Sequence, residues 1–229
     1  MIKIDIKKQL HGSEGQMNLD VNLQIENGDF VALSSLSGSG KTTLLRILAG
    51  LEEAIGTIKI DDEIWLDEKH NLPVQKRKIG FVFQDYALFT NMSVMQNLLY
   101  VSNDKKLANS LLEITELAEL KDRMPNTLSG GQKQRVSLCR AMMNKPKLLL
   151  MDEPLSALDP AMRTKLQNEI LQLHKEFNTT TIMVSHDPSE IYRLSNRVIV
   201  LQQGKIIDDG DARKVLLKTN GSAKFSFEG

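Results

Sequence analysis

Apolar and polar residues alternate along the first part of the chain with the period of β-strands. Residues 1–8 alternate apolar and charged side chains, and Leu19, Val21, Leu23 and Ile25 alternate with polar ones. Patterns of period two predict half-buried strands. Continuous apolar runs predict fully buried strands, and they occur at 30–33, 147–151, 180–184 and 198–201.

Helical spacing replaces this pattern from about Val94 to Asn144, and it returns in residues 160–177, which begin with proline. Buried strands separated by helices indicate a mostly parallel sheet. We therefore predict an α/β fold with a mostly parallel sheet core, an antiparallel β region and an inserted helical subdomain. The expected core covers about 1–87 and 146–229, and the helical subdomain about 88–145.

The composition narrows the class of protein. The 229 residues are 41% hydrophobic and 25% charged, which is typical of a globular domain and excludes disordered, collagen-like and coiled-coil chains. Lys+Arg and Asp+Glu number 29 each, so we expect no nucleic-acid partner. Cys139 is the single cysteine, which excludes an internal disulfide. Residues 1–8 lack the apolar core of a signal peptide, and no apolar run approaches the ~20 residues that cross a bilayer. We therefore expect a cytosolic chain that works at a membrane only through other subunits.

A glycine-rich loop between a predicted buried strand and a predicted helix is the first candidate for chemistry. Its glycines let backbone N–H groups surround phosphates, and the following helix N-terminus adds partial positive charge. Lys41 is expected to reach the phosphates and the Thr42 hydroxyl to ligate Mg²⁺. The expected nucleotide-binding residues are Ser35, Leu36, Ser37, Gly38, Ser39, Gly40, Lys41, Thr42 and Thr43.

Ser35 departs from the usual phosphate-loop pattern, which begins with glycine. If the backbone there needs a positive φ, serine is strained by roughly 1–2 kcal/mol. We expect modest strain at this position, which glycine would relieve.

Two carboxylates follow the apolar run that ends at Met151. A carboxylate at the carboxyl end of a parallel strand lies where open α/β sheets bind their ligands. Asp152 is expected to hold Mg²⁺ and Glu153 to polarise the attacking water.

A second helix start of the anion-binding kind is present in Leu128-Ser129-Gly130-Gly131-Gln132. A single bound nucleotide does not need two such helix starts. The simplest explanation is that this one contacts a nucleotide held by a partner chain.

Six motifs in family order identify a resemblance to the ATP-binding subunit of an ABC transporter, over nearly the whole chain. They are the Walker A loop (Ser37–Thr43), the Q-loop glutamine (Gln84), the signature (Leu128–Gln132), the Walker B strand (Leu148–Glu153), the D-loop (Ser156–Asp159) and the switch histidine (His186).

The resemblance implies a head-to-tail homodimer with two ATP molecules between the chains, and Mg²⁺ as cofactor. It implies that Gln84 ligates Mg²⁺ and senses the membrane subunit, and that His186 holds the γ-phosphate and the attacking water. The signature residues would contact the partner's ATP, and Asp159 would link the two sites; the signature residues are Ser129, Gly130, Gly131 and Gln132. The family usually stacks adenine on an aromatic residue after the first strand, where this chain offers only His11.

The permease, and not the ATPase, contacts the cargo, so the cargo is indicated only by resemblance. Residues 85–94 resemble the permease-docking segment of importers, and residues 64–80 most resemble molybdate importer ATPases. We therefore expect an ATPase on the inner face of the cell membrane, bound to permease subunits and served indirectly by a periplasmic or lipoprotein solute-binding protein.

Two kinds of alternative remain open. The chain could serve a sulfate, polyamine or iron importer, or an exporter or lipoprotein-release system. A non-transport ATPase would need a coiled-coil insertion or a tandem domain, and a simple P-loop kinase would not need residues 128–132. Because the sequence stops soon after residues 205–217, we expect no C-terminal regulatory domain.

Overall fold

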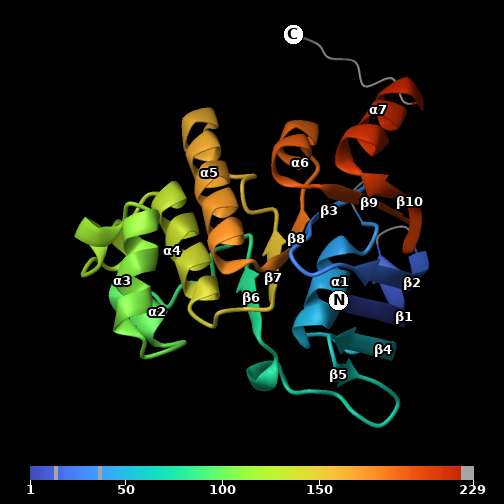
Figure 1. Ribbon diagram of the computed structural model, residues 1–229, viewed down its shortest axis with the longest axis horizontal. Helices are drawn as coiled ribbons and strands as arrows, with labels where there is room; N and C mark the ends of the chain where they lie inside the picture. The colour runs from blue at the N-terminus through green and yellow to red at the C-terminus, as the bar shows by residue number, and fades with distance from the viewer. Residues whose placement is uncertain (13–14, 36–37, 223–229) are drawn as a thin grey trace. The chain divides into compact units, whose positions relative to one another are not determined.

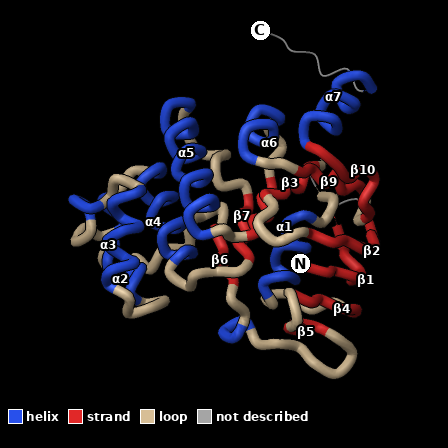
Figure 2. Tube along the Cα trace, in the orientation of Figure 1, coloured by secondary structure: helices blue, strands red, loops and turns tan. Residues whose placement is uncertain are grey.

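The computed structural model describes residues 1–12, 15–35 and 38–222 of the protein. It divides into two compact units, one formed by Met1–Leu72 and Val184–Gly229, the other by Pro73–Met183 (Figure 1). Strands predominate in the first unit and helices in the second, as Figure 2 shows.

The first unit is built on a mixed sheet. Its strands lie in the order β5-β4-β1-β2-β10-β9-β3. The antiparallel part joins β1 to β2 and β4, and β4 to β5, whereas β3 and β9 run parallel. The elements are β1 (Ile2–Gly12), β2 (Gly15–Ile25), β3 (Phe30–Ser34), α1 (Lys41–Ala49), β4 (Ile55–Ile60), β5 (Glu63–Leu66), α6 (Pro188–Leu194), β9 (Arg197–Gln202), β10 (Lys205–Asp211) and α7 (Ala212–Ser222).

The core of this unit follows the predicted alternation. Ile4 and Ile6 on β1 pair with Leu23 and Val21 on β2, and all four side chains are buried. Helix α1 buries five apolar residues, Leu44, Leu45, Ile47, Leu48 and Ala49. Each fully buried Leu or Ile contributes about 1.5–3 kcal/mol relative to an exposed one, so this face stabilises the sheet and fixes the start of α1.

The second unit combines a short sheet with most of the helices. Its strands lie in the order β8-β7-β6, and β6 and β7 run parallel. The elements are a 3₁₀ turn (Val74–Lys76), β6 (Ile79–Val82), α2 (Val94–Leu99), α3 (Lys105–Ile114), 3₁₀ turns (Ala118–Leu120 and Pro125–Thr127), α4 (Gly130–Met142), β7 (Leu148–Asp152), α5 (Pro160–Phe177) and β8 (Thr180–Val184).

Local capping explains where the helices of this unit begin. Ser129 caps α4 and Ser93 caps α2, each in a reciprocal capping box with a glutamine three residues later. Asp159 caps α5, and Pro160 then occupies the first turn, where its missing N–H has no cost. The long helix at 160–177 and the buried strands at 148–152 and 180–184 confirm the predictions from the hydrophobic pattern.

The observed architecture is the predicted α/β fold, with parallel strands, an antiparallel region and a group of helices. The predicted helical subdomain, about 88–145, falls inside the second unit, where α2, α3 and α4 pack on one another. Among the described residues, no helix is both long enough and apolar enough to span a bilayer.

Candidate functional site

The phosphate-type loop of the first unit connects β3 to α1. Gly38 and Gly40 both have left-handed backbones, with φ of 80° and 94°. At Gly40 an added Cβ would also lie 3.2 Å from Leu19 and 3.3 Å from Leu10, so glycine is required there for two reasons. Leu36 and Ser37 lie outside the described residues.

Lys41 is the first residue of α1, and its ammonium group turns back over the loop. Nζ donates to the Ser35 hydroxyl at 2.6 Å and to the Ser35 carbonyl at 3.2 Å. The Ser35 hydroxyl also hydrogen-bonds to that of Ser39. Thr42 and Thr43 follow in the first turn of α1. Ser35 thus holds the lysine that the sequence assigned to the phosphates.

The expected strain at Ser35 is wrong. Among the described residues with positive φ, Ser35 does not occur. Strand β3 ends at Ser34, directly before Ser35. Serine therefore replaces the glycine of the usual pattern without adopting a left-handed backbone.

We expect Ser35→Gly to leave the affinity for an ATP analogue unchanged or to weaken it by up to about fivefold. Glycine relieves no strain at a negative φ, loosens the loop and removes the hydroxyl that holds Lys41. Titration of the analogue into both proteins measures this, and Ser35→Ala separates the lost hydroxyl from the looser backbone. A tighter Ser35→Gly would restore the strain hypothesis.

His186 lies in an exposed loop of the same unit, between β8 and α6. The residue before it is anchored, because Ser185 N–H donates to the Leu33 carbonyl on β3 at 3.3 Å and its hydroxyl donates to buried Glu190 at 2.7 Å. The residue after it, Asp187, caps α6. The tertiary structure therefore fixes the loop of His186 beside the strand that leads into the phosphate loop. No sequence pattern pointed to Glu190.

In the second unit, Asp152 ends β7 and is buried, and Glu153 follows it. Glu153 has a φ of 45°, a left-handed conformation that is uncommon for a side chain with a Cβ. Its carbonyl accepts a hydrogen bond from the Ser156 hydroxyl at 3.0 Å, which closes the turn after the strand. Strained backbone of this kind concentrates at functional positions.

The parallel register of β6 and β7 relates Gln84 to these carboxylates. Val82 pairs with Met151, so the residues that follow the two strands emerge at the same edge of the sheet. Neighbouring strands are about 4.8 Å apart, which puts Gln84 one strand away from Asp152 and Glu153. Carboxylate and amide oxygens are donors that Mg²⁺ prefers, so Asp152 and Gln84 of this unit fit such an ion chemically.

The signature residues open α4 and contact α5. Ser129 is exposed and accepts the Gln132 N–H at 3.3 Å, while the Gln132 side chain accepts the Ser129 N–H at 2.9 Å. A Cβ on Gly131 would lie 2.9 Å from Met162, in the first turn of α5. Exposed Asp159 caps that same turn. One unit thus places the signature directly beside the start of the D-loop helix.

His11, the predicted adenine stacker, belongs to β1, where its backbone pairs with Gln16. Its side chain lies outside the described part of the chain.

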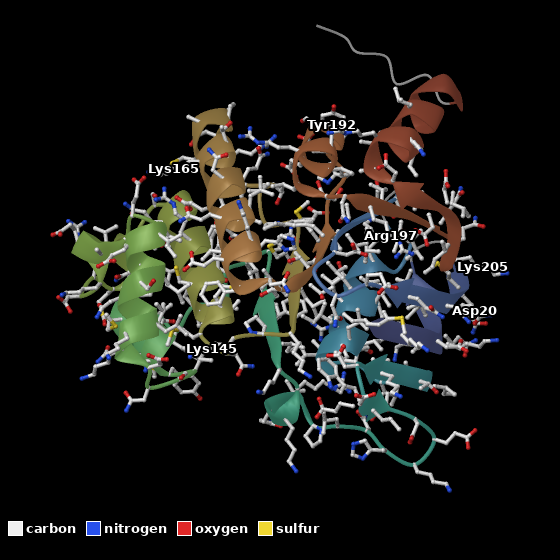
Figure 3. The ribbon with its side chains drawn as sticks, in the orientation of Figure 1. Asp20, Lys145, Lys165, Tyr192, Arg197 and Lys205 are labelled. Atoms are coloured by element: carbon white, nitrogen blue, oxygen red, sulfur yellow. The ribbon has the colours of Figure 1, made fainter. Side chains whose placement is uncertain are left out.

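A buried ion pair joins α4 to α5. The sequence does not predict it, because residue type alone does not distinguish a buried charge of a helix from an exposed one. Arg135 Nε lies 3.7 Å from Glu169 Oε2, and Arg135 also donates to the Thr115 carbonyl at 3.2 Å. Burial raises the pKa of Glu169 to about 7, against the opposing charge of Arg135. On the surface of α5, Lys165 (Figure 3) pairs with Glu116 and lowers the pKa of that carboxyl.

We expect the free energy of unfolding to fall as the pH rises from 5 to 8, through Glu169. Because the folded pKa is about 7 and the ordinary value 4.5, the stabilising contribution is complete below 4.5 and lost as the pH passes 7. The full loss is about 3 kcal/mol. Urea unfolding at pH 5.5 and pH 8 measures the part of this loss that falls above pH 5.5, about 2 kcal/mol. Glu169→Gln is expected to lose most of the pH dependence. An unchanged dependence in Glu169→Gln would contradict the raised pKa.

The fold and the glycine-rich loop define a P-loop nucleotide-binding protein. The sequence model described as ABC transporter matches residues 19–156. The chain belongs to the ABC transporter family and corresponds to its ATP-binding part.

Relatives are similar over most of the chain. The spermidine/putrescine import ATP-binding protein PotA of Haemophilus influenzae is 42% identical over 224 residues, 94% of this chain and 59% of that protein. The probable sulfate/thiosulfate import ATP-binding protein CysA of Chlorella vulgaris is 43% identical over 205 residues, 85% of each chain. This chain therefore spans less than two thirds of the Haemophilus relative.

Solved structures share the fold. The ATP-binding cassette MJ0796, solved as a dimer in a post-hydrolysis state with ADP and Pi, superposes with a TM-score of 0.79 and is 31% identical, covering 93% of this chain and 99% of that one. The structure of cbiO1 from Clostridium perfringens, part of the ABC transporter complex cbiONQ, has a TM-score of 0.81 and 26% identity, over 96% and 92% of the two chains.

Proposed function

We propose that the protein binds and hydrolyses ATP and uses the energy to drive import through a membrane permease. The observation that carries the proposal is the register of β6 and β7, since it brings Gln84, Asp152 and Glu153 to one strand edge. A magnesium-dependent hydrolase needs a metal ligand and a general base side by side.

Each candidate residue has a proposed task. Lys41 and the loop N–H groups bind the phosphates, and Thr42, Gln84 and Asp152 hold Mg²⁺, which neutralises charge that develops on the phosphates. Glu153 accepts the proton of the attacking water, and His186 orients that water against the γ-phosphate. The neighbouring anchors of His186, at Ser185 and Asp187, support this task because they fix the loop on both sides.

We also propose a head-to-tail homodimer, in which the signature of one chain contacts ATP held by the other and Asp159 links the two sites. Ser129 and Asp159 are both exposed, as residues that meet a second chain must be. The dimeric MJ0796 structures support this arrangement.

The permease is proposed to dock on residues 85–94 and the neighbouring end of α2. The rings of Phe89 and Tyr100 pack at a tilt, with their centroids 4.6 Å apart, and Tyr100 and Val101 are 65% and 40% exposed. Exposed apolar side chains gathered in this way mark interaction sites. Docking there would place the protein on the cytoplasmic face of the membrane.

The relatives described above are named for polyamine and sulfate/thiosulfate import. They support an importer ATPase and not molybdate in particular, for which the resemblance of residues 64–80 remains the only argument. Sulfate is an oxyanion too, so we propose a small ionic cargo, with sulfate and polyamines ahead of molybdate.

ATP hydrolysis measured against protein concentration tests the proposed ATPase. We expect a rate per chain that rises with concentration, since two chains form each site, and that falls to background in EDTA. A rate that is strictly proportional to protein concentration, or that survives EDTA, would overturn the dimeric, magnesium-dependent mechanism.

Uptake of labelled sulfate, spermidine and molybdate, in cells with and without the gene, tests the cargo. Loss of uptake of one of them identifies it, and unchanged uptake of all three would contradict the importer proposal.

A further inference from the structure

The segment after Gln84 contains an unusual turn. Tyr86 and Ala87 are consecutive residues with side chains, and both have left-handed backbones, with φ of 65° and 46°. Ala87 N–H donates to the Asp85 carbonyl at 2.8 Å, so Tyr86 is the centre of a three-residue turn with positive φ, a rare and strained conformation. Such a turn persists only where the surrounding structure holds it.

Arg140, in the last turn of α4, holds this one. Its Nη1 donates to the Ala87 carbonyl at 2.6 Å, and its Nη2 donates to the Tyr86 carbonyl at 3.2 Å. The guanidinium also lies over the ring of Phe89, 5.5 Å from its centroid. A planar, forked donor fits two successive carbonyls, whereas the single ammonium of lysine does not. Burial lowers the pKa of Arg140, but an arginine stays charged.

The same helix meets the turn a second time, at its first residue. A Cβ built on Gly130 would lie 3.2 Å from the Tyr86 hydroxyl, so the tyrosine side chain reaches the signature. Arg140 therefore holds the backbone of Tyr86 while Gly130 faces its side chain. Gln84 precedes Tyr86 by two residues, and movement of the turn would displace it.

We propose that Arg140 is a positioning residue: by clamping the Tyr86–Ala87 turn to α4, it sets the orientation of Gln84 relative to the signature. This rests on the proposed function, because it assigns Arg140 a task through Gln84 and its Mg²⁺. A residue with a purely structural task would stabilise the fold without affecting how ATP turnover depends on Mg²⁺.

The test compares Arg140→Lys with wild type and with Arg123→Lys, an exposed arginine on another loop. We expect Arg140→Lys to lower kcat for ATP about tenfold and to raise the half-saturating Mg²⁺ concentration several-fold. The KM for ATP should stay within twofold of the wild-type value. The urea unfolding midpoint should equal that of wild type within error. If Arg140→Lys lowers both kcat and the stability to urea while the half-saturating Mg²⁺ concentration stays unchanged, the proposal is overturned and Arg140 has a structural task.

Hydrogen exchange provides a readout that needs neither nucleotide nor turnover. The Ala87 amide should exchange at least tenfold faster in Arg140→Lys, while the amides in the middle of α4 keep their wild-type rates. Unchanged exchange at Ala87 would overturn the clamp itself. If the wild-type protein hydrolyses no ATP, the proposed function fails, and this measurement still decides whether Arg140 holds the turn.

A rescue variant completes the test. Glycine adopts a left-handed backbone without strain, so Ala87→Gly should stabilise the turn without the clamp. We expect Arg140→Lys with Ala87→Gly to recover kcat to within about threefold of wild type. Failure to recover, with the double variant as inactive as Arg140→Lys, would count against the turn as the means by which Arg140 acts.

Discussion

Replacing Glu153 by glutamine is expected to lower ATP hydrolysis at least a hundredfold and leave ATP binding intact. General bases typically contribute about 10²–10⁴-fold, and glutamine keeps the shape of the side chain without accepting a proton. Glu153 directly follows Asp152, the proposed Mg²⁺ ligand, and its left-handed backbone turns the chain at the end of β7.

The measurement has two parts, phosphate release and gel filtration with ATP. A dimer that binds ATP but cannot hydrolyse it should accumulate, so Glu153→Gln should elute as a dimer where wild type does not. Glu176, an exposed carboxylate in the last turn of α5, serves as the control, and Glu176→Gln should behave as wild type. Turnover near the wild-type rate in Glu153→Gln would remove Glu153 from the position of general base.

Replacing Ser129 by arginine should abolish hydrolysis without weakening ATP binding to the single chain. Ser129 is exposed at the start of α4, and the proposal assigns it to the nucleotide of the partner chain. An arginine there would occupy the space that the partner's γ-phosphate needs. ATP affinity is measured at concentrations where the protein is monomeric, and hydrolysis at high concentration.

The chain contains a matched control for the lost cap. Ser93 caps α2 with the same reciprocal geometry to Gln96 that Ser129 has to Gln132. Ser93→Arg should therefore cost about 1 kcal/mol of stability, as Ser129→Arg does, but should keep the wild-type rate of hydrolysis at high protein concentration without permease. If ATP affinity of the single chain collapses in Ser129→Arg while dimers still form, the signature acts within its own chain and the proposal is wrong.

Several parts of the site are set by contacts between residues that are close in the sequence, and the sequence could therefore predict them. The glycine-rich loop, the cap of α4 at Ser129, the start of α5 at Pro160 and the buried strand that ends at Asp152 all lie where the pattern placed them. Local hydrogen bonds and backbone preferences decide such features, so neighbouring residues carry the information.

Ser35 shows where pattern reasoning fails. The motif predicted a left-handed serine. Whether a position requires glycine depends on its φ, and that angle depends on how β3 continues into the loop. The same holds for Tyr86 and Ala87, which are not glycine although their backbones are left-handed. Nothing in their residue types marks the turn, since Arg140, more than fifty positions away in the chain, maintains it.

Residue types and their order along the chain assign this protein to its class and nominate the residues proposed to contact phosphate, metal and water. Tertiary contacts add which chain segments lie together. Val82 on β6 pairs with Met151 on β7, so the segments that lead to Gln84 and Glu153 leave the same edge of the sheet, and the bond from Ser185 to Leu33 holds the His186 loop beside β3. Burial between α4 and α5 raises the pKa of Glu169. Strand pairing and desolvation depend on residues far apart in the chain, and for that reason no local pattern reveals them.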